Sequence, residues 1–282
     1  YPLTKAVSKQ IMPVYDKPMI YYPLAALLQA GIRDILIIIP PGEEGPFYRL
    51  LGSGGRFGVN ITYEVQEVAR GIADALLIGS QFIGDDSVCL VLGDNIFYSP
   101  NFQDCLDRAV QQKSGACVFG YYVDDPERFG IVEFDDQGKA VSIEEKPEHP
   151  KSNYCVTGLY FYDGTVCEKA KQVKPSARGE LEITTLNEMY LDEGRLDVIT
   201  LGRGYAWLDT GTMASLFEAS NFVRTIEESQ GIMVSVPEEI AFENSWIDKG
   251  KLAQAAKTYG KSPYGQHLQK VVDGRIVESP RD

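Results

Sequence analysis

Short apolar runs, each bounded by glycine, proline or acidic residues, alternate along the chain with stretches that carry apolar residues at helical spacing. Apolar runs of strand length that are rich in β-branched side chains predict strands buried in a sheet. Because helices separate several of these runs, the pattern indicates an α/β fold. The predicted strands are 35–39, 61–65, 88–92, 116–122, 155–162, 196–201 and 205–208. The predicted helices are 17–30, 47–51, 71–79, 101–112, 180–193 and 212–227.

Two short apolar runs at 131–134 and 141–143 enclose the turn sequence Asp-Asp-Gln-Gly at 135–138. This pattern is typical of a β-hairpin. A hairpin within a series of strands and helices predicts a mixed, mostly parallel central sheet with helices on both faces and a small antiparallel subdomain. We expect residues 1–229 to form this domain, and residues 230–282, with short helices and turns, to pack on it as an extension.

The first predicted helix has polar residues and prolines at its start. Asp16 is the expected N-cap, Pro18 then lies in the first turn, and Gly31 ends the helix. Pro23 lies inside the predicted helix and has no backbone N–H to donate, so we expect a kink there.

The glycine-rich segment 52–58 has the composition of a phosphate-binding loop. A phosphate loop follows a strand and opens a helix, whereas this segment follows a predicted helix and leads into a predicted strand. We therefore expect a helix C-terminus and a turn here.

Two aspartates follow predicted strands and have a glycine nearby, which would let another group come close. Asp94 follows the run 88–92, which reads as a strand of a parallel sheet buried on both faces, and Asp209 follows 205–208. Ligands of α/β sheets bind beyond the carboxyl ends of the strands, and Mg²⁺ is held by few carboxylates plus water and substrate phosphate. The pair on one rim favours a Mg²⁺ site. As the alternative, each aspartate is a turn residue, and Asp209 caps the helix that begins near Thr212.

Composition narrows the classes of function. The formal net charge of −13 argues against a nucleic-acid partner, because binding to nucleic acid depends on basic contacts to phosphate. No apolar run reaches the roughly 20 residues that span a bilayer, so we expect no membrane partner.

Five cysteines form no Cys-x-x-Cys pair, and Cys89, Cys117 and Cys155 lie in apolar runs, which predicts buried free thiols and a cytoplasmic protein. His149 and His267 lack the spacing of a zinc site or a catalytic triad.

Several long motifs, spread from the first residue to about Ile247, carry a resemblance to a known family. They lie at 1–4, 8–10, 13–24, 91–98, 144–147, 151–154, 177–184 and 203–212. They resemble the sugar nucleotidyltransferases, and among these the glucose-1-phosphate thymidylyltransferases. The resemblance implies a Rossmann-like nucleotidyltransferase domain at 1–229. It also implies a Mg²⁺-dependent reaction in which glucose 1-phosphate attacks dTTP and gives dTDP-glucose and pyrophosphate.

The resemblance further implies roles for individual residues. The positions that match nucleotide-binding residues are Lys9, Gln10, Gln66, Gly71 and Asp94. Those that match sugar-binding residues are Asn95, Gly130, Glu145, Lys146 and Val156. Those that match catalytic residues are Lys9, Asp94, Lys146 and Asp209, with Asp94 and Asp209 as the Mg²⁺ ligands. In the family, Lys9 and Gln10 match the pair that holds the triphosphate, and Gln66 matches the residue that reads the thymine edge, helped by backbone near Gly71. Lys146 matches the lysine that binds the phosphate of the sugar.

The residues by themselves leave other readings open. Lys9 and Lys146 could be solvated surface charges, and the pair Glu144 and Glu145 could be an exposed strand end. A uridylyl- or cytidylyltransferase acting on the same sugar phosphate, or a non-catalytic regulator that binds sugar nucleotides, would use many of the same positions.

The sequence departs from the family pattern in places. The family begins with a strand and a glycine-rich loop that ends in Gly-Thr-Arg-Leu before Tyr-Pro-Leu-Thr, so we expect that segment to be missing ahead of Tyr1. Residues 67–70 replace a turn that usually contains proline, and Thr185 stands where aspartate is common. The resemblance also implies a homotetramer with a regulatory nucleotide site at an interface.

Overall fold

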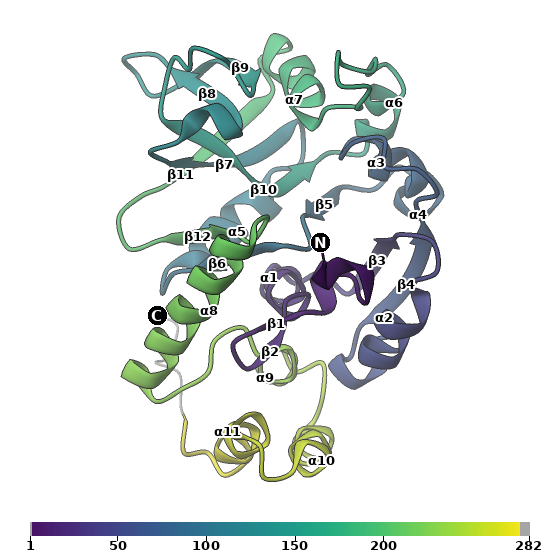
Figure 1. The fold of residues 1–282 in the computed structure, drawn as a ribbon, viewed down its shortest axis with the longest axis vertical. Helices are drawn as coiled ribbons and strands as arrows, with labels where there is room; N and C mark the ends of the chain where they lie inside the picture. The colour runs from purple at the N-terminus through teal and green to yellow at the C-terminus, as the bar shows by residue number, and fades with distance from the viewer. Residues whose placement is uncertain (1, 277–282) are drawn as a thin grey trace.

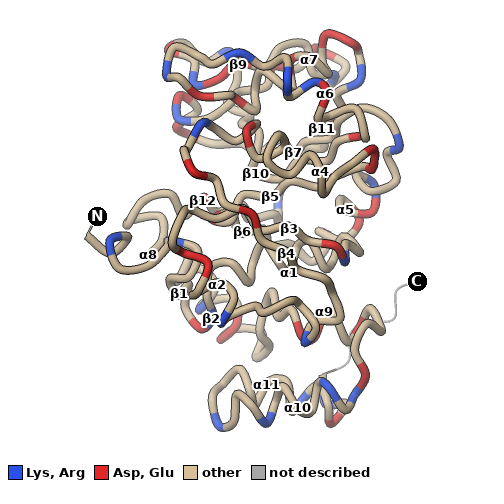
Figure 2. Tube along the Cα trace, turned by 90° about the vertical axis from the view of Figure 1, so that its right-hand side faces the viewer, with Lys and Arg blue, Asp and Glu red and all other residues tan. Residues whose placement is uncertain are grey.

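The computed structural model describes residues 2–276. Tyr1, the first residue of the family-like stretch 1–4, lies outside the described residues, as do residues 277–282. Figure 1 shows the hairpin β8–β9 (130–145) with α7 (Ile183–Asp192) at one end of the molecule and the helices α10 (Lys249–Tyr259) and α11 (Pro263–Val272) at the other. In Figure 2, acidic and basic residues are interspersed along the chain, so the net negative charge is spread over the molecule.

Within the described residues, six strands form the largest sheet, in the order β11–β7–β10–β8–β9 with β5 also paired to β10. Their bounds are Val88–Val91 (β5), Ala116–Tyr122 (β7), Gly130–Phe134 (β8), Ala140–Glu145 (β9), Tyr154–Tyr162 (β10) and Leu196–Leu201 (β11). β10 is the longest of the six and runs antiparallel to β5, β7 and β8, whereas β7 and β11 are parallel. The strand positions therefore agree with the apolar runs of the sequence.

The α/β class and the mixed sheet are confirmed, but parallel pairing is less extensive than the sequence predicts. The prediction that the run 88–92 is a strand of a parallel sheet buried on both faces is wrong. β5 pairs antiparallel with β10, and all of its side chains are half-buried. The reason is that β10, which the sequence shows only as another apolar run, reverses direction relative to its neighbours.

The remaining strands form three pairs. β3 (Asp34–Ile39) and β4 (Asn60–Val65) are parallel, and β6 (Asn95–Tyr98) is antiparallel to β12 (Ala206–Asp209). β1 (Pro13–Val14) and β2 (Lys17–Pro18) form a short antiparallel pair. The predicted hairpin is confirmed as β8 and β9, and the Asp135 carboxylate accepts hydrogen bonds from the backbone N–H groups of Gln137 and Lys139 in its turn.

The first helix begins later than the sequence predicts. α1 spans Tyr21–Gln29, and Ile20, not Asp16, is the residue before it. Asp16 lies in the turn between β1 and β2, where its carboxylate accepts a hydrogen bond from the Lys17 ammonium. Pro23 is the third residue of α1, and an N–H at that position has no partner within a helix. Pro23 therefore removes no hydrogen bond from α1, and the reason for expecting a kink there does not apply.

The glycine-rich segment 52–58 is a helix end and a turn, as predicted. It follows α2 (Glu44–Leu51) and leads into β4. Gly54 has a φ of +84°, and a Cβ there would lie 2.7 Å from the carbonyl oxygen of Val59, so only glycine fits this turn.

Helices cover the sheets on several sides. The others are α3 (Asp74–Ile78), α4 (Ser80–Ile83), α5 (Phe102–Gln111), α6 (Val166–Ala170), α7 (Ile183–Asp192), α8 (Met213–Gln230), α9 (Pro237–Glu243), α10 (Lys249–Tyr259) and α11 (Pro263–Val272). α1 packs between two cores: Leu24 and Leu28 contact the α9–α11 side, whereas Ala26 lies in a cluster with Phe97 and Phe102. None of the helices in residues 2–276 is long and apolar enough to cross a membrane.

The predicted thiol environments are partly confirmed. Cys117 and Cys155 are buried, while Cys89 is half-buried. Burial raises the pKa of the Cys117 and Cys155 thiols to about 12, so neither is ionised at neutral pH. These cysteines act as small apolar core residues.

Candidate active site

Asp94 and Asp209 are brought together by the pairing of β6 with β12. Asp94 lies in the turn that follows β5 and directly precedes β6, and Asp209 is the last residue of β12. In the antiparallel register Asp209 stands opposite Asn95, the neighbour of Asp94. The next residue, Thr210, is buried and donates both its N–H (3.1 Å) and its hydroxyl (2.7 Å) to the backbone oxygen of Asp94. The two aspartates lie close enough for their charges to interact, but across an antiparallel pair rather than on one rim of a parallel sheet.

The alternative role of Asp209 as a helix cap is wrong. α8 is capped by Thr212, whose hydroxyl accepts a hydrogen bond from the Ser215 N–H at 3.1 Å. The Ser215 hydroxyl in turn accepts from the Thr212 N–H, which completes a capping box. The Asp209 carboxylate is therefore not needed to start α8.

The Asp209 carboxylate lies in an electrostatically unfavourable place. Burial raises the pKa of Asp209, and the negative charge of Asp94 raises it further, while Lys9 and Arg128 act in the opposite direction. Lys9 donates from its ammonium to the Asp94 carboxylate, and Asn95 donates to the other oxygen of Asp94 at 3.0 Å. Two neighbouring carboxylates with one close ammonium form a group that attracts further positive charge.

Lys9 and Gln10 lie in a short 3₁₀ helix, Lys9–Ile11, that packs against the turn at Asp94. The Lys9 side chain is 26% exposed and ion-paired, so it is not a free solvated charge. A Cβ at Gly93 would lie 2.9 Å from Cγ of Gln10. The glycine before Asp94 thus permits the close approach that the sequence predicts, and the group that approaches is Gln10.

Gln66 and Gly71 lie on the loop between β4 and α3, as expected for a strand-to-helix connection. The Gln66 side chain is half-buried and donates from Nε2 to a carboxylate oxygen of Asp74 at 2.9 Å. Gly71 has a φ of +102°, and a Cβ there would lie 2.5 Å from the carbonyl oxygen of Leu181. The predicted helix 71–79 begins only at Asp74, because the residues before it pair with the Leu181 backbone instead.

Four of the predicted sugar-binding residues lie on four different strands, and the fifth, Lys146, directly follows β9. Gly130 on β8 is directly opposite Glu145 on β9, and Val156 lies half-buried on β10. Asn95 is 2% exposed, and its side-chain oxygen accepts from the Gly158 N–H at 3.1 Å and from the Trp207 indole at 2.6 Å. The Asn95 side-chain oxygen thus joins β6 to β10 and β12, while its amide nitrogen donates to Asp94.

Glu145 is the centre of a second polar cluster. Its carboxylate accepts from the Thr184 hydroxyl at 2.5 Å and from the Arg178 guanidinium at 3.1 Å, and the Lys146 ammonium lies 3.8 Å away. Glu145 is half-buried, whereas Glu144 beside it is exposed. The alternative interpretation of the pair as an exposed strand end therefore applies only to Glu144.

Lys146 occupies strained backbone. Its φ is +44°, a left-handed value that costs energy for any residue with a Cβ. Its N–H donates to the carbonyl oxygen of Phe129 at 3.0 Å, which holds this conformation.

Two residues of the Glu145 cluster were not among the predicted site residues. Arg178 contacts Glu145, Glu180 and Glu182, and Thr184 donates to Glu145. Both lie in the family-like stretch 177–184, so the motif marked the segment without indicating which of its side chains face the site.

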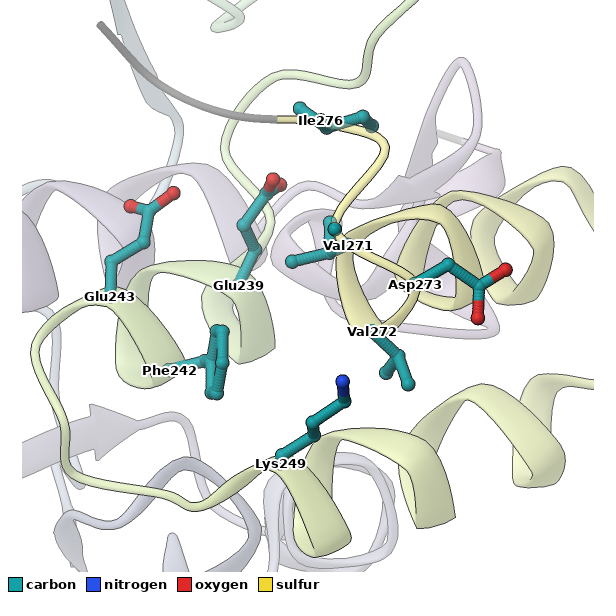
Figure 3. A pocket seen from close by; sticks show the side chains of 9 residues that line it. Glu239, Phe242, Glu243, Lys249, Val271, Val272, Asp273 and Ile276 are labelled. Atoms are coloured by element: carbon teal, nitrogen blue, oxygen red, sulfur yellow. The ribbon is translucent and has the colours of Figure 1, made fainter. Parts of the chain in front are cut away.

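The pocket in Figure 3 lies away from both clusters. It has a volume of about 380 Å³ and is lined by residues of α9, α10 and the end of α11. The carboxylates of Glu239 and Glu243, the ammonium of Lys249 and the ring of Phe242 face it or lie at its edge. None of the predicted site residues lines this pocket. The polar clusters around Asp94 and Glu145, not this cavity, carry the chemistry that the sequence predicts.

The donor set at Asp94 and Asp209 restricts the metals that fit. Among the described residues, no group of three or more histidine, cysteine or acidic side chains could hold a metal ion. A transition-metal site of several protein ligands is therefore not built here. Two carboxylates are what Mg²⁺ uses when water and substrate phosphate supply its other ligands.

Comparison with known proteins gives the same family for sequence and fold. Residues 1–226 match the family model described as nucleotidyl transferase. A glucose-1-phosphate thymidylyltransferase of Neisseria meningitidis is 57% identical over 96% of this chain and 94% of its own length. One from Xanthomonas campestris is 58% identical over 95% of this chain and 91% of its own.

Solved structures agree with this result. A candidate glucose-1-phosphate thymidylyltransferase from Bacillus anthracis, in complex with sucrose, has a TM-score of 0.74 and 45% identity, covering 79% of this chain and 89% of that one. A UDP-glucose pyrophosphorylase with bound UDP-glucose has a TM-score of 0.68 at 22% identity, which shows similarity of fold. It covers 80% of this chain and 93% of that one.

Proposed function

We propose a reaction for this chain, which belongs to the nucleotidyl transferase family and is a relative of the glucose-1-phosphate thymidylyltransferases. A phosphate oxygen of glucose 1-phosphate attacks the α-phosphorus of dTTP, the bond from that phosphorus to the oxygen of the β-phosphate breaks, and pyrophosphate leaves. The products are dTDP-glucose and pyrophosphate. The observation that carries the proposal is the group formed by Lys9, Asp94 and Asp209 where β6 pairs with β12.

Mg²⁺ is the proposed cofactor, with Asp94 and Asp209 as its protein ligands. The fit rests on their hard oxygen donors and on the raised pKa of Asp209, whose charged form a nearby cation would favour. When bound, Mg²⁺ supplies neutralisation of phosphate charge. Lys9, now paired with Asp94, provides an ammonium for the triphosphate, and Gln10 lies beside it.

The nucleotide and the sugar phosphate are assigned to different parts of the chain. Gln66 reads the edge of the thymine base, and the backbone near Gly71 lies next to the same base. Asn95, Gly130, Glu145 and Val156 surround the glucose hydroxyls, and Lys146 binds the phosphate that attacks. The Glu145 cluster supports this assignment, because a carboxylate accepts hydrogen bonds from sugar hydroxyls but repels phosphate.

The domain roles, the substrates, the compartment and the oligomeric state are proposed from the resemblance to the family. Residues 1–229 carry catalysis and residues 230–282 form an extension of the same domain. The shared core of α1 with α9–α11 supports this for the described part of the extension, residues 230–276. The substrates are the small molecules dTTP and glucose 1-phosphate rather than nucleic acid or a membrane. The protein acts in the cytoplasm as a homo-oligomer, a tetramer by resemblance.

The direct test is release of pyrophosphate by the full-length protein. We expect release when dTTP, glucose 1-phosphate and Mg²⁺ are all present, and none when the sugar phosphate is left out. Faster turnover with UTP or CTP than with dTTP would contradict the choice of base. Binding of dTDP-glucose, measured by calorimetry, without any release of pyrophosphate would indicate a regulator in place of an enzyme.

A further inference from the structure

Asp74 is a buried carboxylate that contacts the residue assigned to the base. It is the first residue of α3 and is 1% exposed. One of its oxygens accepts a hydrogen bond from Nε2 of Gln66 at 2.9 Å. The other oxygen makes no hydrogen bond within the described residues but lies 2.9 Å from the guanidinium of Arg70. A charge buried this deeply requires partners, and its two partners are Arg70 and the Gln66 amide.

The contact fixes which way the Gln66 amide points. An amide has a donating nitrogen and an accepting oxygen, and the two are exchanged by a half-turn of the group. An ionised carboxylate only accepts hydrogen bonds, so the nitrogen of Gln66 must face Asp74. The half-turn would place the Gln66 oxygen against the Asp74 oxygen, which is repulsive in a buried site. Asp74 therefore leaves one arrangement of the Gln66 amide.

The backbone on the N-terminal side of Asp74 is held in place by hydrogen bonds to Leu181. The Leu181 N–H donates to the Arg70 carbonyl at 2.6 Å, and the Ala73 N–H donates to the Leu181 carbonyl at 3.1 Å. The loop that carries Arg70 is thus tied to the segment before α7, and α3 begins immediately afterwards. Because these bonds are in the backbone, a substitution of the Asp74 side chain leaves them intact.

The fixed amide distinguishes two kinds of pyrimidine edge. Thymine offers an N3–H donor next to a carbonyl acceptor, whereas cytosine offers an N3 acceptor next to an amino donor. An amide that reads one edge must make a half-turn to read the other from the same position. Uracil has the same edge as thymine, so this feature does not separate dTTP from UTP.

We propose that Asp74 is a positioning residue that holds the Gln66 amide in the orientation that pairs with thymine and rejects cytosine. The inference rests on the proposed function, in which Gln66 reads the base. Asp74 itself touches no substrate and acts through Gln66. Its role is selectivity between bases rather than the transfer step.

The test is a double-mutant cycle read out as the ratio of kcat/KM for dTTP to that for dCTP, with glucose 1-phosphate and Mg²⁺ in the full-length protein. Asp74→Asn keeps the size of the side chain but can donate as well as accept, so both orientations of Gln66 become possible. We expect this variant to lower the ratio about tenfold, the low end of what one bidentate contact contributes to base discrimination. In the Gln66→Ala background, where no amide remains to be oriented, Asp74→Asn should leave the ratio unchanged.

Asp163→Asn is the matched control. Asp163 is another buried carboxylate, 7% exposed, that accepts from the Gly115 N–H at 2.6 Å and lies outside the proposed site. This variant should lower thermal stability without changing the ratio for the two nucleotides. If Asp74→Asn fails to fold, Asp74→Ser provides a smaller side chain that can also donate and accept.

The outcomes separate the inference from the function on which it rests. An unchanged ratio for Asp74→Asn, together with a lowered ratio for Gln66→Ala, overturns the role of Asp74 and leaves the thymidylyltransferase activity standing. An equal effect of Asp74→Asn with and without Gln66 overturns it as well, because the effect then does not pass through the amide. If Gln66→Ala leaves the use of dTTP unchanged, the assignment of the base is wrong, and the inference falls with it.

Discussion

Glu145→Gln tests the sugar subsite, because it removes the charge of Glu145 and leaves its shape almost unchanged. Glu145 accepts hydrogen bonds from Thr184 and Arg178 and has Lys146 at 3.8 Å. In the variant the amide oxygen can still accept from Arg178, and the amide nitrogen can donate to the Thr184 hydroxyl. Arg178 also keeps Glu182, to which it donates at 2.9 Å. We therefore expect the free energy of unfolding to change by less than about 1 kcal/mol, as for a partly exposed ion pair.

The effect on the sugar phosphate should be larger. A hydrogen bond to a charged group contributes about 1.5–3 kcal/mol and one between neutral groups about 0.5–1.5 kcal/mol. The loss for one glucose hydroxyl is thus about 1–1.5 kcal/mol, which raises the KM for glucose 1-phosphate roughly five- to tenfold. The KM for dTTP should stay the same, because the nucleotide is assigned to other residues.

The assay is steady-state pyrophosphate release with each substrate varied in turn. Glu144→Gln is the matched control, since Glu144 is the adjacent residue, carries the same group and is exposed. It should change neither KM. An equal rise of the KM for dTTP in Glu145→Gln, or the same effect from Glu144→Gln, would show that the subsite is misplaced.

Three further predictions follow from the same geometry. Gln66→Ala should weaken dTTP binding by about 1–3 kcal/mol, the usual loss when a buried polar group is left without its hydrogen-bond partner. Unchanged dTTP affinity in calorimetry would rule out the role of Gln66 with the base. Lys146→Ala should raise the KM for glucose 1-phosphate and lower kcat together, since Lys146 binds the attacking phosphate; a change in the KM for dTTP alone would argue against this. The raised pKa of Asp209 means that the folded protein binds this proton more tightly than the unfolded chain. The contribution of Asp209 to stability therefore falls as the pH rises from about 4 through its folded pKa, and Asp209→Asn should lack this part of the decline. Thermal melts of both proteins at pH 4 and pH 7 measure the difference, and identical pH dependence would contradict it.

The sequence predicts the secondary structure here better than the pairing of the strands. Strand 196–201, the hairpin β8–β9 and the turn at 52–58 all lie where periodicity and turn residues indicate. The β6–β12 pair was not predicted, because residues 95–98 were not recognised as a strand. The two strands are also more than 100 residues apart, and periodicity does not reveal which strands pair. The antiparallel direction of β10 was missed for the same reason.

The start of the first helix was missed for a different reason. The sequence Asp16-Lys17-Pro18 has the composition of a helix cap, but Lys17 is 2% exposed and its ammonium contacts Asp16 and, at 3.1 Å, Glu227 on α8. This buried ion pair joins the chain ends of the domain, and local sequence gives no sign of a partner 210 residues away. The tertiary contact decides the local conformation there.

In the candidate site, too, local sequence reveals some of the residues and tertiary contacts reveal the others. Strand-end aspartates beside glycines are visible in the sequence, and the structure brings Asp94, Asp209 and Lys9 together. Asp74 resembles any acidic residue in the first turn of a helix, and only its contact with Gln66 sets it apart. Arg178 likewise gains its meaning from the position of Glu145 in space.

The central claim is that Asp94 and Asp209 together support a Mg²⁺-dependent transfer. Asp209→Asn removes one charge but keeps the size of the side chain, and α8 retains its own cap at Thr212. The measurement is kcat for pyrophosphate release from dTTP and glucose 1-phosphate at saturating Mg²⁺, in the full-length protein. We expect the variant to fold, to bind dTTP weakly and to lose at least about a hundredfold in kcat, which is typical when one group that stabilises transition-state charge is removed. Near-normal Mg²⁺-dependent turnover by Asp209→Asn would contradict the account.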